Sequence, residues 1–292
     1  MTLRVCLLGF GEVGQTLATG LLGRVDSLSA WDIRFADSAS GPSRAASRIG
    51  VTAAVNAAVA VKGANLIVSA VTAAQISAAA RSITSGIARD AWYLDLNSTS
   101  PASKNAAADI VSAAGGRFVE AAVMSPIQPR GAASPMLIGG DHATAFQPLA
   151  SQLGFTGMRV MPGKPGSASA AKMCRSVLVK GLEALVLESL LAARRHGVED
   201  AVLDSLQGLK INDWREDARY MMSRALLHGA RRAEELREVA RTVGEAGLTP
   251  HMSSAGAAWQ EWAAEHPEIA AEKDLGKLLD GLLSAQPGGV TT

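Results

Sequence analysis

The sequence predicts an α/β protein, with a doubly wound parallel sheet in residues 1–162 and an all-helical region in residues 163–292. Short apolar runs alternate with helical patterns through about residue 160, whereas the chain after Pro165 shows helical patterns only. Between the two regions, the segment Met161-Pro162-Gly163-Lys164-Pro165 interrupts both patterns, because proline and glycine end regular structure. We therefore expect the domain boundary at this segment.

The first region is predicted to be a sheet covered by helices. The apolar runs expected to form strands cover residues 5–10, 31–37, 66–71, 92–96, 117–123, 135–140 and 157–162. The helical patterns between them cover residues 13–22, 73–83, 102–114 and 142–153. Parallel neighbours need crossover connections, which are usually helical, so this alternation indicates a mostly parallel sheet with helices on both faces. The last runs are the ones that could pair antiparallel at one edge.

The second region begins with a helical pattern over residues 167–196 that has small residues in its first turns. Further helical patterns cover residues 199–208, 213–246, 250–264 and 274–284. Strand signals are absent from this part of the sequence, which predicts an all-helical domain.

Composition excludes several classes of function. The 292 residues carry a formal net charge of +1, so no bulk field favours nucleic acid. No stretch approaches the roughly 18 apolar residues of a membrane span, and the first apolar run is too short for a signal peptide. Cys6 and Cys174 supply neither a disulfide framework nor a metal site. We expect a cytoplasmic protein without a metal, a nucleic-acid partner or a membrane partner.

A glycine-rich loop follows the first apolar run. The stretch Gly9-Phe10-Gly11-Glu12-Val13-Gly14 has the spacing G-x-G-x-x-G, between a predicted strand and a predicted helix. In this pattern Gly9 makes the turn, Gly11 lets the backbone approach a pyrophosphate, and Gly14 lets the helix lie close to the strand. The unpaired N–H groups at the start of the helix would then face the anion. The loop and its context predict a Rossmann domain that binds a dinucleotide.

The choice of dinucleotide is expected to depend on the end of the second strand. Asp37 ends the run at residues 31–37, where a carboxylate accepts hydrogen bonds from the ribose hydroxyls and repels a 2'-phosphate. NAD is therefore favoured. NADP stays possible, because Ser38, Ser40 and Arg44 could surround a phosphate and offset Asp37. Val71 and Thr72, after the third predicted strand, complete the expected cofactor contacts.

Two further segments carry a resemblance to a known family. A polar cluster, Asp95-Leu96-Asn97-Ser98-Thr99-Ser100-Pro101, follows a strand, and the long predicted helix carries Lys172. Together with the glycine loop and the segment MLIGGD at residues 136–141, these segments resemble the β-hydroxyacid dehydrogenase family, which includes 3-hydroxyisobutyrate and 6-phosphogluconate dehydrogenases. The resemblance covers about the first 180 residues, and the C-terminal helices are similar to those of a divergent subgroup.

The resemblance implies roles for individual residues. Lys172 matches the family's catalytic lysine, which protonates the alkoxide formed when hydride reaches a carbonyl and removes that proton in oxidation. Ser176 stands where the family has asparagine, and Ser125-Pro126-Ile127 replaces a serine-glycine-glycine loop. The substrate contacts that the resemblance and the helical spacing suggest are Asn97, Ser98, Ser125, Ser176 and Lys180. Asn97 and Ser98 could instead cap the next helix, and Lys180 could be a solvated residue of a long helix.

The sequence therefore predicts an NAD(P)-dependent oxidoreductase that interconverts a small β-hydroxy acid and its oxo acid or semialdehyde. Two alternatives stay open. An imine reductase shares this architecture, and a protein that binds the cofactor without catalysis is compatible with the altered loop at Ser125. Because family members usually pair their helical domains, we also expect a homodimer.

Overall fold

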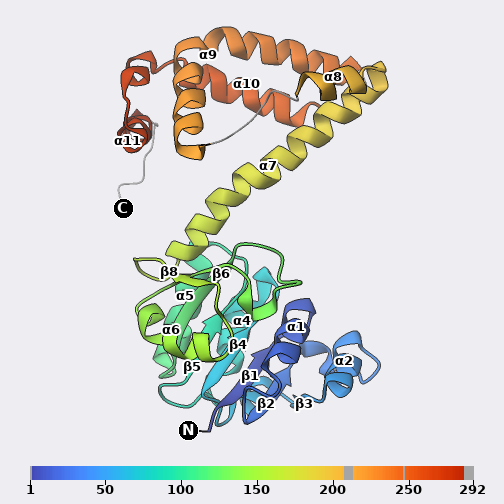
Figure 1. The fold of residues 1–292 in the computed structure, drawn as a ribbon, viewed down its shortest axis with the longest axis vertical. Coiled ribbons are helices and arrows are strands. Elements are labelled where there is room, and N and C mark those ends of the chain that lie inside the picture. Colours follow the sequence, from blue (N-terminus) through green and yellow to red (C-terminus); the bar gives the residue numbers. More distant parts are fainter. Residues whose placement is uncertain (1, 207–212, 246, 286–292) are drawn as a thin grey trace. The chain divides into compact units, whose positions relative to one another are not determined.

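The computed structural model describes residues 2–206, 213–245 and 247–285, and the chain divides into two compact units, Met1–Val177 and Leu178–Thr292. The division falls inside one long helix, α7 (Ser167–His196) (Figure 1). The boundary near residue 162 therefore stays a prediction. Within the described ranges, no helix is both long enough and apolar enough to cross a membrane.

The first unit is built on an eight-stranded sheet in the order β3-β2-β1-β4-β5-β6-β7-β8. All neighbouring strands pair parallel except β6 and β7, which confirms the predicted fold class and the expectation of an antiparallel pair toward one edge. The strands are β1 (Arg4–Leu8), β2 (Ser27–Trp31), β3 (Thr52–Ala53), β4 (Leu66–Ser69), β5 (Trp92–Asp95), β6 (Arg117–Val123), β7 (Met136–Gly139) and β8 (Met158–Val160).

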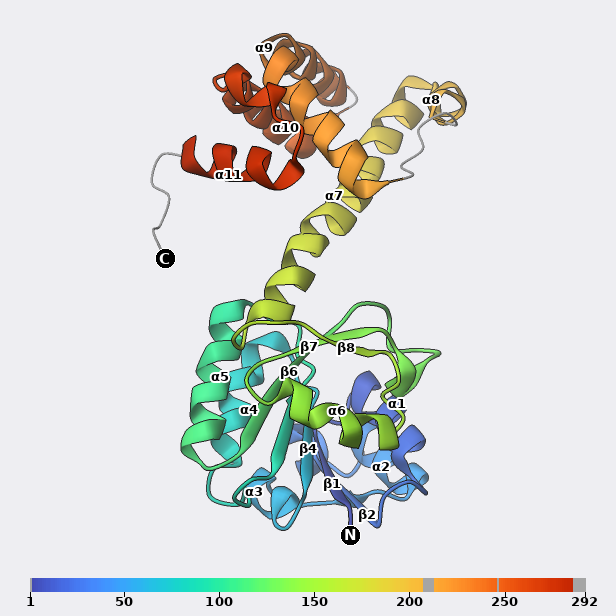
Figure 2. The ribbon, with the colours of Figure 1, turned by 60° about the vertical axis from the view of Figure 1, so that its left-hand side comes forward.

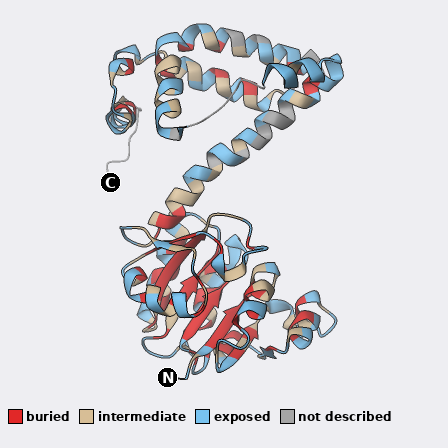
Figure 3. Cartoon of the chain, viewed as in Figure 1, coloured by how far each residue is buried: buried red, intermediate tan, exposed pale blue. Residues whose placement is uncertain are grey.

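Helices cover both faces of this sheet (Figure 2). On one face α1 (Glu12–Leu21), α2 (Gly41–Ile49) and α6 (Ala143–Gln152) pack against alternate strand residues such as Leu7 and Leu94. On the other face α3 (Ala57–Val61), α4 (Ile76–Ser82) and α5 (Pro101–Ala113) pack against the residues between them, such as Leu8 and Tyr93. The strands β1, β4, β5, β6 and β7 are buried on both faces, as continuous apolar runs predict for a parallel sheet, whereas β3 at the edge is exposed (Figure 3).

The second strand lies earlier than the sequence pattern predicts. It ends at Trp31, and the 3-10 helix η1 (Ile33–Ala36) occupies the stretch expected to be a strand. The cause is Asp32, whose Oδ1 accepts a hydrogen bond from the N–H of Arg34 at 2.9 Å and turns the chain. The assignment of residues 31–37 as a strand is therefore wrong, and Asp32, not Asp37, follows the strand directly.

The second unit is helical. It contains the rest of α7, followed by α8 (Glu199–Ser205), α9 (Trp214–Glu245), α10 (His251–Ala263), η4 (Pro267–Ala271) and α11 (Leu275–Ala285). A small core of Leu226, Leu278 and Leu282 with two alanines joins α9, α10, η4 and α11. Helices α9 and α10 pack closely, because a Cβ at Gly229 would lie 2.1 Å from the carbonyl oxygen of Gln260.

Candidate functional site

The glycine loop joins β1 to α1 and has the geometry expected of a pyrophosphate site. Gly9 has a φ of +88°, and a Cβ there would lie 2.3 Å from the carbonyl oxygen of Ala70. A Cβ at Gly14 would lie 2.2 Å from the carbonyl oxygen of Gly9, so these two glycines are required by the protein's own packing. A Cβ at Gly11 would meet nothing within 4 Å. Space beside Gly11 is therefore open at the start of α1, where a Rossmann loop holds an anion.

The start of α1 offers free donors to such an anion. Gly11 is the N-cap residue, and within the described part of the chain no side chain caps this helix end. The first N–H groups of an α-helix have no partners inside the helix, and the helix dipole favours negative charge beside them. Glu12 and Val13 form this first turn, and the N–H of Phe10 is bound by Asp32. All six predicted loop residues therefore lie at the junction of β1 and α1.

Asp32 supports the loop from the end of β2. Its Oδ2 accepts a hydrogen bond from the N–H of Phe10 at 2.7 Å, and Arg34 Nε lies 3.8 Å from its Oδ1. Asp37 and Ser38 are exposed one turn later, and Asp37 Oδ1 accepts from the N–H of Ala39 at 2.8 Å. The sequence pattern thus missed Asp32, the acidic residue next to the loop.

Asn97 lies in a buried network at the carboxyl ends of β4 and β5. Its Nδ2 donates to Ser69 Oγ and to Asp95 Oδ2, both at 2.9 Å, and its Oδ1 accepts from the N–H of Val71 at 2.6 Å. Both amide protons and the carbonyl oxygen are thereby used. Asn97 orients the segment at Val71 and Thr72, and its direct contact with substrate stays a prediction.

A buried ion pair supports this network. Lys104 of α5 donates to the carboxylate of Asp95, and Lys104 and Asp95 are 1% and 0% exposed. The Lys104 ammonium also donates to the backbone oxygen of Asp95 at 3.0 Å. Burial, with the nearby charge of Asp95, raises the pKa of Tyr93 well above its ordinary value, so this phenol stays neutral. The contacts of Lys104 with Asp95 hold the polar cluster after β5 on its buried side.

Lys172 lies against the exposed end of the same cluster. Its Nζ donates to Ser98 Oγ at 2.5 Å, which joins the first turns of α7 to the loop after β5. Lys172 is half-buried, whereas Ser98 is exposed. Two residues that the family resemblance assigned separately to the site are therefore neighbours in the structure.

The other predicted substrate contacts are less defined. Ser176 is half-buried, one helical turn after Lys172. Ser125 follows β6, and its hydroxyl donates to the backbone oxygen of Pro126 at 3.0 Å. The side chain of Lys180 lies outside the described residues. Substrate binding by these three residues stays a prediction.

Glu120 is a buried charged residue that the sequence analysis did not select. It lies in β6 with 0% exposure, and its Oε1 and Oε2 accept from the N–H groups of Ala168 and Ser169 at 2.9 and 3.3 Å. A signal was present in the sequence, because Glu120 is the one acidic residue in the otherwise apolar run at residues 118–123. Its partners could not be read from the sequence, since they lie 48 and 49 residues away.

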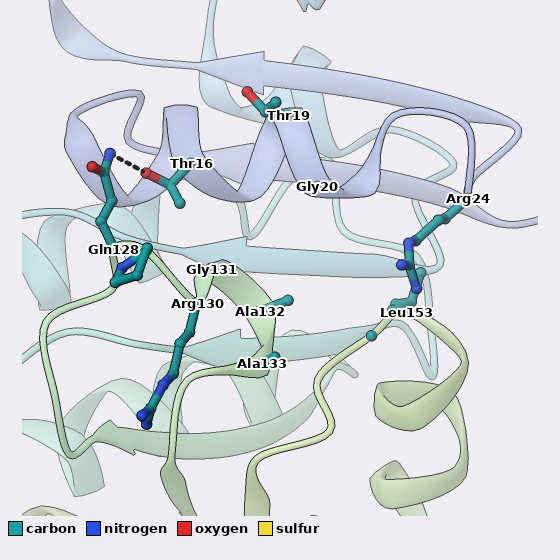
Figure 4. Close-up of a pocket in the computed structure, with 12 residues that line it drawn as sticks. Thr16, Thr19, Gly20, Arg24, Gln128, Arg130, Gly131, Ala132, Ala133 and Leu153 are labelled. Atoms are coloured by element: carbon teal, nitrogen blue, oxygen red, sulfur yellow. Dashed lines mark hydrogen bonds between the residues drawn. The ribbon is translucent and has the colours of Figure 1, made fainter.

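A surface pocket of about 540 Å³ lies along the outer face of α1 (Figure 4). It is lined by Thr16, Thr19 and Gly20 of α1, by the segment at residues 128–133, and by Arg24 and Leu153 at one end. Gln128 closes its other end by donating to Thr16 Oγ1 at 3.3 Å. Its lining does not include the glycine loop, Ser98 or Lys172, so we place the candidate active site at the carboxyl edge of the sheet, where ligands of such sheets bind.

Comparison with known proteins identifies the family. Residues 4–98 match the family model described as NADP oxidoreductase, coenzyme F420-dependent, and residues 193–263 match a domain of unknown function, DUF1932. A conserved hypothetical protein from Sinorhizobium meliloti 1021 is 33% identical, with 97% of this chain and 96% of that protein covered and a TM-score of 0.60. That protein and a second relative of 31% identity, whose structure is similar to 3-hydroxyacid dehydrogenases, show that the chain belongs to the 3-hydroxyacid dehydrogenase-like family.

Two further structures support this placement. Conserved protein MTH1747, of unknown function and structurally similar to 3-hydroxyacid dehydrogenases, is 31% identical, with 92% of this chain and 99% of that protein covered and a TM-score of 0.59. An imine reductase from Myxococcus stipitatus, solved with NADP+, is 17% identical, with 94% of this chain and 99% of that protein covered and a TM-score of 0.71. At this identity the likeness concerns the fold alone. The predicted family and oxidoreductase class are confirmed, and NAD and NADP are both consistent with them.

Proposed function

We propose that the protein transfers hydride between a nicotinamide dinucleotide and a small β-hydroxy acid, or the corresponding oxo acid or semialdehyde. The observation that carries this proposal is the contact between Lys172 and Ser98 at the carboxyl edge of the sheet. A lysine ammonium beside a hydroxyl is suited to stabilise and protonate an alkoxide. The same edge carries the open glycine loop.

The residues at the loop fit the dinucleotide. The open space at Gly11 and the uncapped start of α1 would hold the pyrophosphate, and Val71 and Thr72 lie on the neighbouring strand end. A bound nicotinamide supplies the hydride in reduction and accepts it in oxidation. The protein contributes the orientation of the loop through Asp32 and the orientation of the second segment through Asn97.

In this proposal Lys172 moves the proton. In reduction its ammonium donates to the oxygen of the former carbonyl, and in oxidation the neutral amine removes the hydroxyl proton. Ser98 accepts a hydrogen bond from Nζ and so limits the directions in which the ammonium can point. Ser98 and Ser125 are the hydroxyls we assign to substrate binding, with Ser176 and Lys180 further along α7.

We infer that Arg34 favours NADP(H) over NAD(H). Arg34 follows β2, its side chain is 60% exposed, and its Nε lies 3.8 Å from Asp32, whose charge it offsets. Arg44 and Ser40 are less suited to this role, because both donate to backbone oxygens of their own loop. Replacing Arg34 by Gln should weaken NADPH binding by about 1 kcal/mol, roughly fivefold, and leave NADH binding unchanged. Equal effects on both cofactors would contradict this assignment.

The reaction is tested by mixing the protein with NADH or NADPH and a panel of small oxo acids, semialdehydes and cyclic imines. We expect turnover of an oxo acid or semialdehyde, and a loss of at least about 100-fold in kcat for Lys172→Met. Lys164→Met is the matched control, since Lys164 is an exposed lysine just before α7. Turnover of imines alone would support the imine reductase alternative, and tight cofactor binding with no turnover would support a non-catalytic protein.

We also propose a homodimer that buries the exposed side of α7. Leu178, Leu182 and Leu185 are 55%, 46% and 46% exposed, and their spacing places them on one side of the helix. A row of exposed leucines on a long helix is typical of a helix–helix interface. A second copy of this chain is the partner we assign to it.

A further inference from the structure

The start of α7 is held by a residue of the sheet. The first four N–H groups of a helix need partners from outside it, and most helices obtain one from the side chain of the N-cap residue. Gly166 precedes α7 and has no side chain to offer, and a Cβ there would lie 3.1 Å from Pro101. Glu120 of β6 accepts from two of these groups instead, at Ala168 and Ser169.

The side chain of Glu120 lies close against the neighbouring strand β7. Gly139 is its register partner on β7, and a Cβ at Gly139 would lie 2.6 Å from Glu120 Oε1. The carboxylate is fully buried and faces the start of α7, where it accepts from the N–H groups of Ala168 and Ser169. Its position is therefore fixed on one side by the sheet and on the other by the helix.

The contact between Glu120 and α7 is connected to Lys172 and Ser98 through the hydrogen bonds of one further residue, Ser169. Ser169, whose N–H is bound by Glu120, donates its hydroxyl to the backbone oxygen of Thr99. Thr99 follows Ser98, and Lys172 lies three residues after Ser169 on the same helix. Glu120 thus connects both members of the Lys172–Ser98 contact to the middle of β6.

We propose that Glu120 is a positioning residue, which sets the place of Lys172 by holding the first turn of α7; this inference rests on the function proposed above. Glu120 does not contact the reacting groups, and its effect passes through backbone N–H groups. The conservative variant Glu120→Gln keeps one acceptor oxygen but points an NH₂ donor at a second N–H donor. At least one of the two hydrogen bonds is then lost.

The test compares full-length wild type and Glu120→Gln by three measurements. Hydrogen exchange at the amides of Ala168 and Ser169 should become about tenfold faster in the variant, with the sheet amides unchanged. Labelling of Lys172 by an amine-reactive ester, read by mass spectrometry against the exposed Lys164, should rise at least about threefold as Lys172 leaves Ser98. With a substrate in hand, kcat should fall at least about tenfold and the Kd of the cofactor should stay within about twofold.

Two further variants sharpen the result. Asp109→Asn removes an exposed carboxylate of α5 and should change none of the three measurements. Gly139→Ala keeps the Glu120 charge but displaces its carboxylate, so it should act like Glu120→Gln if the latter fails to fold.

Unchanged exchange or unchanged Lys172 labelling would overturn the proposal, and so would faster exchange spread evenly over the sheet, which marks a purely stabilising role. These two readouts need no substrate. If wild type turned over no carbonyl compound, the proposed function would fail while the positional claim would still be decided by exchange and labelling.

Discussion

Replacing Gly11 by alanine separates cofactor binding from protein stability. Gly11 has φ −74° and ψ −158°, which any residue can adopt, and its added Cβ would meet nothing within 4 Å. The free energy of unfolding should therefore change by no more than about 0.5 kcal/mol. If a pyrophosphate lies against this residue, the added methyl group occupies the space that the pyrophosphate needs. NADPH affinity should then fall at least about tenfold, or roughly 1.4 kcal/mol.

Gly9→Ala is the matched control, with the opposite result for stability. A φ of +88° costs an alanine about 1 kcal/mol, and moving the Ala70 carbonyl oxygen away from a Cβ at 2.3 Å adds about 2 kcal/mol. A loss of about 3 kcal/mol lowers the melting temperature of a domain of this size by roughly 6–12 °C. Thermal melts and nicotinamide fluorescence titrations measure both effects. Wild-type NADPH affinity in Gly11→Ala would refute the assignment of the loop as a pyrophosphate site.

Three further predictions concern the core, the interface and the thiols. Lys104→Met leaves the buried Asp95 carboxylate without its ammonium partner and should lower the free energy of unfolding by about 3 to 5 kcal/mol, measured by urea denaturation; a loss below about 1 kcal/mol would contradict the ion pair's role. Leu182→Glu should convert a dimer to a monomer in sedimentation experiments, and a monomeric wild type would exclude the proposed interface. Burial raises the pKa of Cys6 to about 12, so iodoacetamide should label only the exposed Cys174 in the folded protein at pH 8. Because unfolded Cys6 loses its proton near pH 9 and folded Cys6 does not, stability should fall as pH rises from about 9 to 12, and a pH-independent stability in that window would contradict the burial effect.

The sheet and its helices were predictable because their signals are local. A buried parallel strand is a short apolar run and a covering helix has a 3.6-residue pattern, so β4, β5, β6, β7 and β8 lie within the predicted runs and β1 begins one residue before its run. The glycine loop was predictable for the same reason, since its G-x-G-x-x-G spacing between a strand and a helix is a local signal, whereas the close approach of Gly9 to Ala70 is not.

The end of β2 was not predictable in this way. Residues 31–37 alternate like a strand, and only the hydrogen bond from Arg34 to Asp32 reveals that the chain turns there. Helix α2 was missed because it is weakly apolar, and α3 because it has only five residues; the side chains of Ser40 and Asn56 cap these two helices.

The supporting residues of the site were hidden because their partners are distant in the sequence. Asp95 appeared in the polar cluster, but its buried partner Lys104 looked like an ordinary helix lysine. Glu120 was visible as a charge in a predicted strand, yet its partners lie at the start of α7, 48 and 49 residues later in the chain. Sequence patterns thus selected the residues that we propose to react, and the structure shows the contacts that hold them.

The central claim is that Lys172 carries the proton in a nicotinamide-dependent reaction at the sheet edge. The most direct test compares single-turnover hydride transfer, from reduced cofactor to the best carbonyl substrate of the panel, in wild type, Lys172→Met and Lys164→Met. We predict that all three proteins bind the cofactor with equal affinity and that only Lys172→Met loses the transfer step, by at least about 100-fold. Full transfer in Lys172→Met would contradict the account.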